Sequence, residues 1–143
     1  MSVLGNEEPV ASVPGEILPS DEFYSYRAKY IDGQSRLLIP APLSKELTDE
    51  ICSIAIKAYQ AIDCAGMARV DFLLEKSSAK VFLNEVNTIP GFTQISMYPK
   101  LWEASGLSYG DLINRLIDLA LERKAENDRT IHNYTSISGK EQG

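Results

Sequence analysis

Short apolar runs separated by prolines fill residues 2–40, and this pattern predicts extended structure rather than helix. Strands are expected around residues 11–13, 23–26 and 36–39.

Three later segments carry apolar residues every three or four positions, as amphipathic helices do. Ser44 can cap the first helix, which should end near Ile62. Pro99 at a first helical position predicts a short second helix that ends at Gly106. The third should span about 108–126, opened by a capping box. The expected buried faces of the two long helices are Leu47, Ile51, Ile54, Ala55, Ala58 and Ile62, and Leu112, Leu116, Leu119 and Ala120.

Between the first two helices, residues 69–75 and 81–88 alternate apolar and polar side chains with the period of two that strands require. We predict a β-hairpin joined by an odd-numbered turn of three residues, 77–79. A two-residue turn would instead send Asp71 and Glu85 to opposite faces of the sheet. The second strand should present Val81, Leu83, Glu85 and Asn87 on one face.

This register gathers four polar side chains where strands normally carry Val or Thr. Asp71 would lie opposite Glu85 and Arg69 opposite Asn87, with Cβ atoms about 4.5–5.5 Å apart. Facing carboxylates repel each other unless a cation lies between them, and Mg²⁺ bound by carboxylates and phosphate oxygens is the usual solution. A guanidinium beside them suits phosphate or an oxyanion. The alternative is a solvated face with an Arg69–Asp71 surface ion pair, worth at most about 1 kcal/mol.

Composition narrows the class of protein. A chain of 143 residues that is 44% hydrophobic suits one globular domain with a real core. A net charge of -6 with 14 scattered basic residues argues against a nucleic-acid surface. Cys52 and Cys64 lack metal-site spacing, which is typical of reduced thiols in a cytosolic protein. We find neither a run of membrane length nor a signal peptide, and therefore expect no membrane partner and a cytoplasmic location.

Three runs closely resemble the C-terminal part of D-alanine-D-alanine ligases, which belong to the ATP-grasp superfamily. They are A-R-V-D-F at 68–72, L-N-E-V-N-T-I-P-G-F-T at 83–93 and S-M-Y-P-K-L-W-E-A-S-G at 96–106. The resemblance covers nearly the whole chain, from Val3 to about Arg123. It agrees with the α+β class that the order of elements predicts, an antiparallel sheet flanked by helices, and implies the C-terminal part of an ATP-grasp fold.

The resemblance implies a role for each matching residue. Asp71, Glu85 and Asn87 match Mg²⁺ or Mn²⁺ ligands, with Glu85 bridging two ions on the phosphates of ATP. Arg69 matches an arginine that stabilises a tetrahedral intermediate, and the backbone N–H of Gly91 completes that oxyanion hole. The residues implied to contact the nucleotide are Lys29, Asn84 and Glu85. Those implied to contact the substrate are Tyr30, Ser96 and Met97. Ser96 is also implied to be catalytic, as are Arg69 and Gly91.

Some of these residues have ordinary structural explanations when the resemblance is set aside. Gly91 after Pro90 is then a turn residue, Ser96 a helix cap and Met97 a core side chain. The resemblance also implies that Tyr30, where ester-forming relatives carry histidine, favours dipeptide synthesis.

The reaction implied is ATP-dependent joining of two D-alanines through an acyl phosphate, for peptidoglycan precursors. We expect residues 1–127 to be the C-terminal ligase domain and residues 128–143 a flexible polar tail. The N-terminal and central domains of such a ligase are absent from the chain, so we expect a fragment that is inactive alone and prone to form homodimers through exposed apolar surface. Two alternatives stay open: another ATP-grasp carboxylate-amine ligase, and a non-catalytic module that binds metal or a partner.

Overall fold

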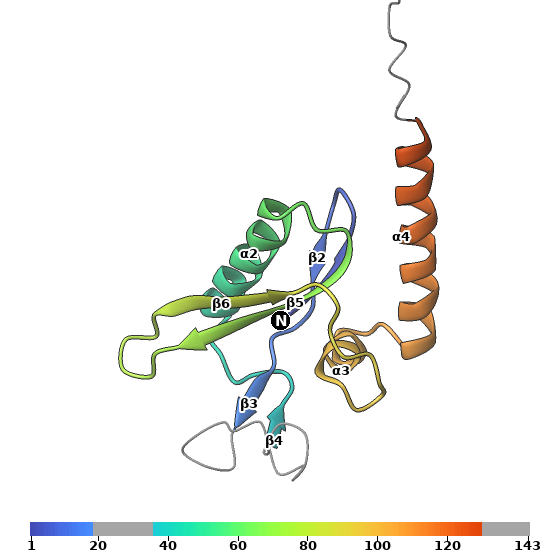
Figure 1. The fold of residues 1–143 in the computed structure, drawn as a ribbon. Helices are drawn as coiled ribbons and strands as arrows, with labels where there is room; N and C mark the ends of the chain where they lie inside the picture. The colour runs from blue at the N-terminus through green and yellow to red at the C-terminus, as the bar shows by residue number, and fades with distance from the viewer. Residues whose placement is uncertain (19–35, 130–143) are drawn as a thin grey trace, which may run out of the picture.

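A four-stranded antiparallel sheet forms the centre of the protein (Figure 1). The computed structural model describes residues 1–18 and 36–129. The predicted α+β class is confirmed. In the sheet, the strands follow the order β2 (Val10–Ala11), β1 (Ser2–Gly5), β5 (Gly66–Leu74) and β6 (Val81–Asn87), while β3 (Glu16–Leu18) and β4 (Arg36–Leu38) pair separately. The helices are α2 (Lys45–Ala61), α3 (Met97–Ala104) and α4 (Tyr109–Arg129).

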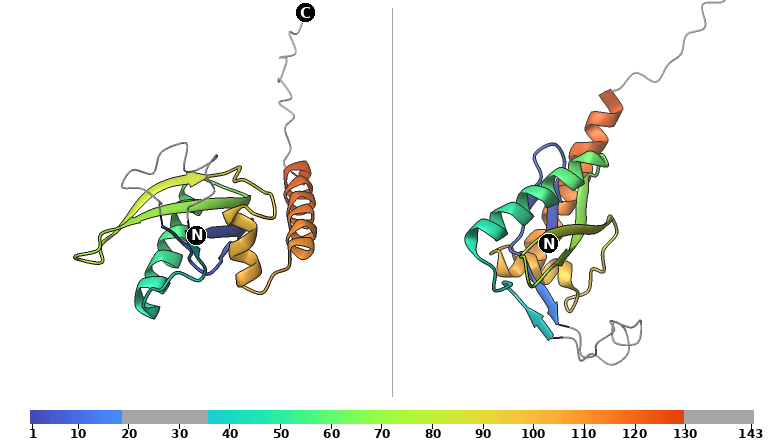
Figure 2. Two further views of the ribbon diagram at one scale, coloured as in Figure 1. Left: turned by 90° about the horizontal axis from the view of Figure 1, so that it is seen from below. Right: turned by 90° about the vertical axis from the view of Figure 1, so that its left-hand side faces the viewer.

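Helices cover both faces of this sheet, and the strands separate α2 from α4 (Figure 2). Neighbouring residues of β1 point to opposite faces, so Val3 packs against α2 while Leu4 packs against α3 and α4. The core on the α2 side contains Met1, Val3, Ile51, Ala55, Tyr59, Ala68 and Val70. The core on the other side contains Leu4, Tyr98, Trp102, Leu112 and Leu119.

The sequence pattern did not predict β1, although this strand lies inside the sheet. All four of its residues are buried, because both faces are covered, and the alternation that marks a half-exposed strand is therefore missing. It also did not predict β3. The strands expected near residues 11–13 and 36–39 correspond to β2 and β4, and the one expected at 23–26 lies outside the described residues.

The boundaries of α2 agree with the prediction. The Ser44 side chain accepts a hydrogen bond from the backbone N–H of Leu47 at the N-cap, and Ile62 is the C-cap residue. Its buried residues lie four positions apart and include Tyr59, which the predicted face omitted, while Ile62 is 52% exposed. The Tyr59 hydroxyl donates to the Gly5 carbonyl at 2.7 Å. Burial raises the pKa of this phenol, which stays protonated and links α2 to the sheet.

α3 begins at Met97, two residues earlier than predicted. Pro99 therefore occupies the third helical position, still within the first turn, where a backbone N–H has no intrahelical acceptor. The last helical residue is Ala104 and Ser105 is the C-cap, so the predicted end at Gly106 lies just past the helix, where a φ of +92° favours glycine. The N–H of Leu107 then donates to the Trp102 carbonyl at 2.9 Å, which closes the last turn.

α4 begins with the predicted cap, because the Ser108 hydroxyl accepts the backbone N–H of Asp111 at 3.2 Å. The helix continues to Arg129, three residues past the predicted end. Leu112 and Leu119 are buried as predicted, but Ala120 is exposed. Residues 130–143, most of the predicted tail, lie outside the described part of the chain.

Cys52 and Cys64 are both free thiols, and burial raises the pKa of each. Among the described residues, we find no helix whose length and apolar character would allow it to cross a membrane.

We predict that Leu119→Ala lowers the free energy of unfolding by about 2–5 kcal/mol, because it leaves a cavity between α4 and the sheet. The matched control on the same helix is Leu121→Ala, since Leu119 is 1% exposed and Leu121 is 64% exposed. The control should cost less than about 0.5 kcal/mol. Urea denaturation measures both, and equal losses would contradict the packing of α4 described here.

Candidate functional site

The β5–β6 hairpin brings together the four polar residues that the sequence predicted. Asp71 pairs with Glu85 and Arg69 pairs with Asn87 in the antiparallel register. The turn, however, was predicted wrongly. The N–H of Glu75 donates to the Lys80 carbonyl at 3.0 Å, so the loop between this pair holds the four residues 76–79.

A β-bulge at Asn84 compensates for the even-numbered turn. Asp71 pairs with Glu85, yet the next residue, Phe72, pairs with Leu83, so Asn84 has no partner and shifts the register by one. Without this extra residue Asp71 would face Asn84, and Glu85 would point to the other side of the sheet. The carboxylates therefore face each other because the turn and the bulge offset one another.

The bulge also overturns the prediction that Val81 and Leu83 share the face of Glu85. Beyond the bulge, Leu83 pairs with Phe72 and belongs to the opposite face. Val81 and Phe72 pack against the core on the α2 side. The face that carries the acidic residues instead continues through the cross-strand pair of Leu73 and Phe82.

Arg69 holds Asp71 through two parallel hydrogen bonds. Its Nε lies 2.8 Å from Oδ1 and its Nη2 lies 2.8 Å from Oδ2. The same Nη2 lies 3.8 Å from Oε1 of Glu85. The ion pair that was the alternative explanation thus exists, but the Arg69 side chain is only 16% exposed and also reaches a second carboxylate. Bidentate pairs of this kind are stronger and more rigid than exposed ones.

Asn87 completes the group, and its side chain is oriented by the backbone. The amide oxygen accepts the N–H of Ile89 at 3.1 Å. An amide oxygen has two lone pairs, so this bond leaves the oxygen able to accept a second donor or a cation.

The donor set fits a hard divalent cation. Asp71 and Glu85 supply carboxylate oxygens and Asn87 an amide oxygen, which are the ligand types that Mg²⁺ and Mn²⁺ prefer. Within residues 1–18 and 36–129, no three His, Cys, Asp or Glu side chains converge on one point. A metal bound here would consequently need further oxygens from water or phosphate, which is how Mg²⁺ is usually held beside nucleotides.

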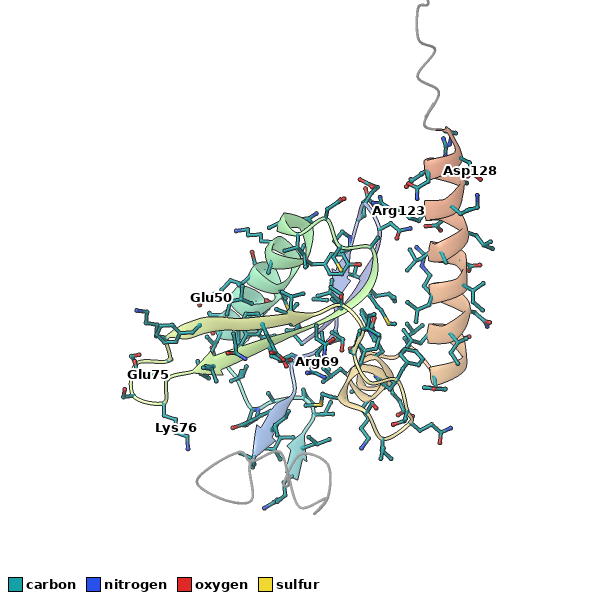
Figure 3. The ribbon with its side chains drawn as sticks, viewed as in Figure 1. Glu50, Arg69, Glu75, Lys76, Arg123 and Asp128 are labelled. Atoms are coloured by element: carbon teal, nitrogen blue, oxygen red, sulfur yellow. The ribbon has the colours of Figure 1, made fainter. Side chains whose placement is uncertain are left out.

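This group lies on a part of the sheet that α3 and α4 do not cover. Figure 3 shows Arg69 at the base of the hairpin, with Glu75 and Lys76 at its far end. The Glu85 side chain is 53% exposed, and Leu73 on the same face is 61% exposed. A hollow of about 370 Å³ lies elsewhere and is lined by Gln94, Pro99, Glu103 and Tyr109. Hence the four polar residues form an open face rather than an enclosed pocket.

The segment 88–96 leads from β6 directly to α3 and carries two of the predicted residues, Gly91 and Ser96. A Cβ added to Gly91 would lie 3.1 Å from Oγ of Ser96, so the absence of a side chain keeps this hydroxyl accessible from that direction. Met97 is the first residue of α3 and half-buried.

Ser96 stands at the N-cap position of α3, as the alternative interpretation expected, but its side chain makes no capping hydrogen bond. One reason is that Pro99 occupies the third helical position and has no N–H to donate. The Ser96 hydroxyl turns back and accepts the N–H of Thr93 at 3.0 Å. It also lies 2.8 Å from the Thr93 hydroxyl.

Aromatic residues anchor this segment. The Phe92 ring lies 5.9 Å from the ring of Tyr98 and 5.5 Å from that of Tyr109, measured between centroids. The Tyr109 hydroxyl donates to the Phe92 carbonyl at 2.9 Å. The Ser2 hydroxyl donates to the Tyr98 carbonyl at 3.3 Å, and Ser2 pairs with Arg69 in the sheet. The start of α3 therefore lies one strand away from the hairpin base.

Sequence reasoning missed Thr93, Phe92 and Tyr109. The only available signal was the spacing Thr-x-x-Ser, which allows a local hydroxyl contact but occurs often by chance.

Of the residues predicted to contact the nucleotide or the substrate, Asn84 is the exposed bulge residue. Lys29 and Tyr30 lie outside the described residues.

Comparisons with known proteins agree on one family. The family model described as "D-ala D-ala ligase C-terminus" matches residues 1–118. The D-alanine--D-alanine ligase of Thermoanaerobacter sp. (strain X514) is 62% identical over 129 residues, which cover 90% of this chain and 36% of that protein. The chain thus spans about a third of the length of the curated relatives that it matches.

Solved structures give the same result. The D-alanine-D-alanine ligase from Coxiella burnetii matches with a TM-score of 0.77 and 45% identity, covering 90% of this chain and 32% of that one. The Bacillus anthracis D-alanine--D-alanine ligase complexed with ATP matches with a TM-score of 0.68 and 28% identity, covering 88% and 40%.

We predict that Arg69 and Asp71 are energetically coupled. A double-mutant cycle with Arg69→Met and Asp71→Asn should give a coupling of about 1–2 kcal/mol, because the bond is bidentate and partly buried. The control cycle uses Lys124→Met and Asp128→Asn on α4, where the two side chains are 70% and 61% exposed. That pair should give about 0.3–0.5 kcal/mol. A coupling free energy no larger than in the control would show that Arg69 and Asp71 form only an ordinary surface ion pair.

Proposed function

This chain belongs to the family of D-Ala D-Ala ligase C-terminal domains, and from that premise we propose that it forms the metal- and nucleotide-binding part of a D-alanine-D-alanine ligase. One observation carries the proposal: Asp71 faces Glu85 across the hairpin, and Arg69 contacts both carboxylates. The reaction transfers the γ-phosphoryl group of ATP to the carboxylate of one D-alanine. The amine of a second D-alanine then attacks the acyl phosphate, loses a proton and displaces phosphate to leave the dipeptide.

Asp71, Glu85 and Asn87 would hold two Mg²⁺ or Mn²⁺ ions, with Glu85 as the shared ligand. Ions held by these residues would supply positive charge to offset that of the transferring phosphate. The two carboxylates and Arg69 sum to one net negative charge, which attracts a cation but is too small to hold one tightly. The nucleotide would therefore bind together with its metal, and Asn84 on the bulge and Lys29 are proposed to contact it.

Arg69 is proposed to stabilise the negative charge that develops on the carbonyl oxygen of the acyl phosphate when the amine attacks it. Asp71 keeps the guanidinium in one orientation, so little reorganisation is needed when that charge appears. The backbone N–H of Gly91 would be the second donor. The preceding residue, Pro90, is buried, and this restricts the position of the Gly91 N–H.

The second amino acid is proposed to dock at the start of α3. Its carboxylate would lie against the Ser96 hydroxyl and the backbone of Met97, where the partial positive charge of a helix N-terminus favours an anion. Tyr30 would order this substrate and favour an amine over a hydroxyl as the attacking group.

The other protein groups that the reaction needs would come from polypeptide outside this chain. The face with Asp71 and Glu85 is open, and electrostatic stabilisation of phosphoryl transfer needs water to be excluded. We therefore propose that the chain alone is inactive and that N-terminal and central ligase domains close over this face. We place the assembled ligase in the cytoplasm, where it would supply peptidoglycan precursors.

We predict that a chimera carrying this chain in place of the matching third of the Thermoanaerobacter ligase forms ADP in proportion to D-alanyl-D-alanine. Glu85→Gln should lower kcat by about 100-fold or more, since even outer-shell partners of metal ligands cost about 10–100-fold. Glu75→Gln at the far end of the hairpin is the matched control and should leave kcat unchanged.

The same assay separates the alternatives. Turnover of another amino acid without turnover of D-alanine would favour a different carboxylate-amine ligase. Absence of turnover with every amino acid, in a chimera that folds, would favour a non-catalytic module. Normal turnover by Glu85→Gln would contradict the proposed metal site.

We also predict that Mn²⁺ added with a non-hydrolysable ATP analogue broadens the amide NMR signals of residues 70–72 and 84–88 in the chain alone, because paramagnetic broadening falls steeply with distance from the ion. Asp71→Asn should remove the effect, whereas Glu75→Gln should retain it. Broadening centred on another acidic region, such as Asp63 or Asp128, would place the metal elsewhere.

A further inference from the structure

Thr93 contacts the Ser96 hydroxyl with two different groups. Its backbone N–H donates to Ser96 Oγ at 3.0 Å, and its own hydroxyl oxygen lies 2.8 Å from the same atom. In return, the N–H of Ser96 donates to the Thr93 carbonyl at 2.8 Å. Three bonds therefore join two residues only three positions apart, and they define the place of the serine oxygen.

The direction of the hydroxyl contact decides what Ser96 can do. Either hydroxyl can donate across the 2.8 Å contact. A serine hydroxyl has one proton and two lone pairs. When Thr93 donates both its N–H and its O–H, both lone pairs of Ser96 are used, and the serine proton is left to point outward. An anion arriving at Ser96 favours this arrangement, since a carboxylate can only accept hydrogen bonds.

We propose that Thr93 is a positioning residue that turns Ser96 into a hydrogen-bond donor for the carboxylate of the second amino acid. This inference rests on the proposed function, because it names the residue that prepares the proposed acceptor site. Thr93 itself does not touch the substrate. It acts by occupying the acceptor side of the serine oxygen.

Three neighbouring features direct the serine proton toward a ligand. Pro99 has no N–H to donate, and the Ser96 side chain makes no capping bond that would hold it against the helix. Gly91 leaves open space beside the hydroxyl, since a Cβ there would lie 3.1 Å from it. Phe92, next to Thr93, is clamped by the Tyr109 hydroxyl and two aromatic rings. Thr93 consequently has a fixed place from which to donate.

A purely structural role predicts different behaviour. If Thr93 only closed a local turn, its backbone N–H would suffice, and the side-chain hydroxyl would not matter. Thr93→Val removes the hydroxyl while keeping the shape and the N–H. Thr93→Ser keeps the hydroxyl and removes only a methyl group. The same Thr→Val exchange at Thr48 on α2, away from this segment, is the matched control.

The experiment measures kcat and the KM for the second D-alanine in the chimera described above, together with the Kd of D-alanyl-D-alanine by calorimetry. Thr93→Val should raise this KM and this Kd about tenfold, the loss expected for one hydrogen bond to a charged group, with kcat changed by less than about threefold. Thr93→Ser and Thr48→Val should stay within about twofold of the unchanged chimera. In a Ser96→Ala background, Thr93→Val should have no further effect, because Thr93 acts only through Ser96.

Each other outcome is informative. An unchanged KM and Kd in Thr93→Val would overturn the proposal while the proposed function stands. Equal damage by Thr93→Val and Thr93→Ser, with a lowered Tm in both, would also overturn it, because the methyl group and not the hydroxyl would then matter. A chimera that folds but neither turns over D-alanine nor binds the dipeptide would overturn the proposed function, and this inference with it.

Discussion

The register of the β5–β6 hairpin is the constraint on which the rest of the structure depends. Slipping this pairing by one residue would turn Glu85 toward the core on the α2 side and bring Val86 out of it. A carboxylate in that core would lose its hydration without gaining a partner, which is costly. The apolar contacts of Phe72, Val81 and Val86 therefore do more than stabilise the sheet. They also hold Asp71 and Glu85 on the same face, where Arg69 can reach both.

The arrangement of the helices explains why this face stays open. α2 packs along one side of the sheet, against β1, β2, β5 and β6. On the other side, the core formed with α3 and α4 reaches Met67 on β5, which lies two residues before Arg69 and on the same face. Beyond that point the face is left to polar residues and to the exposed pair of Leu73 and Phe82. The segment after Asn87 then leads directly to α3, so Ser96 of the proposed acceptor site follows the last proposed metal ligand by nine residues.

Much of this could be predicted from the sequence, and the exceptions have physical reasons. The facing of Asp71 and Glu85 was predicted correctly from the two-residue period together with an odd-numbered turn. The turn itself was predicted wrongly, because an even-numbered turn and a bulge at Asn84 produce the same facing. β1 was missed because a strand buried on both faces shows no alternation. Tyr59 was missed because its polar hydroxyl is not typical of a core residue, although its ring is fully buried. The roles proposed for Gly91, Ser96 and Met97 came from family resemblance, while the role proposed for Thr93 came only from the hydrogen bonds of the folded segment.

The proposed metal site is tested most directly by a crystal structure of the chimera grown with Mn²⁺ and a non-hydrolysable ATP analogue, with the metal located by anomalous scattering. We expect two anomalous peaks bound by Asp71, Glu85 and Asn87, with Glu85 in contact with both. Ordered nucleotide whose metal touches none of these three side chains would contradict it.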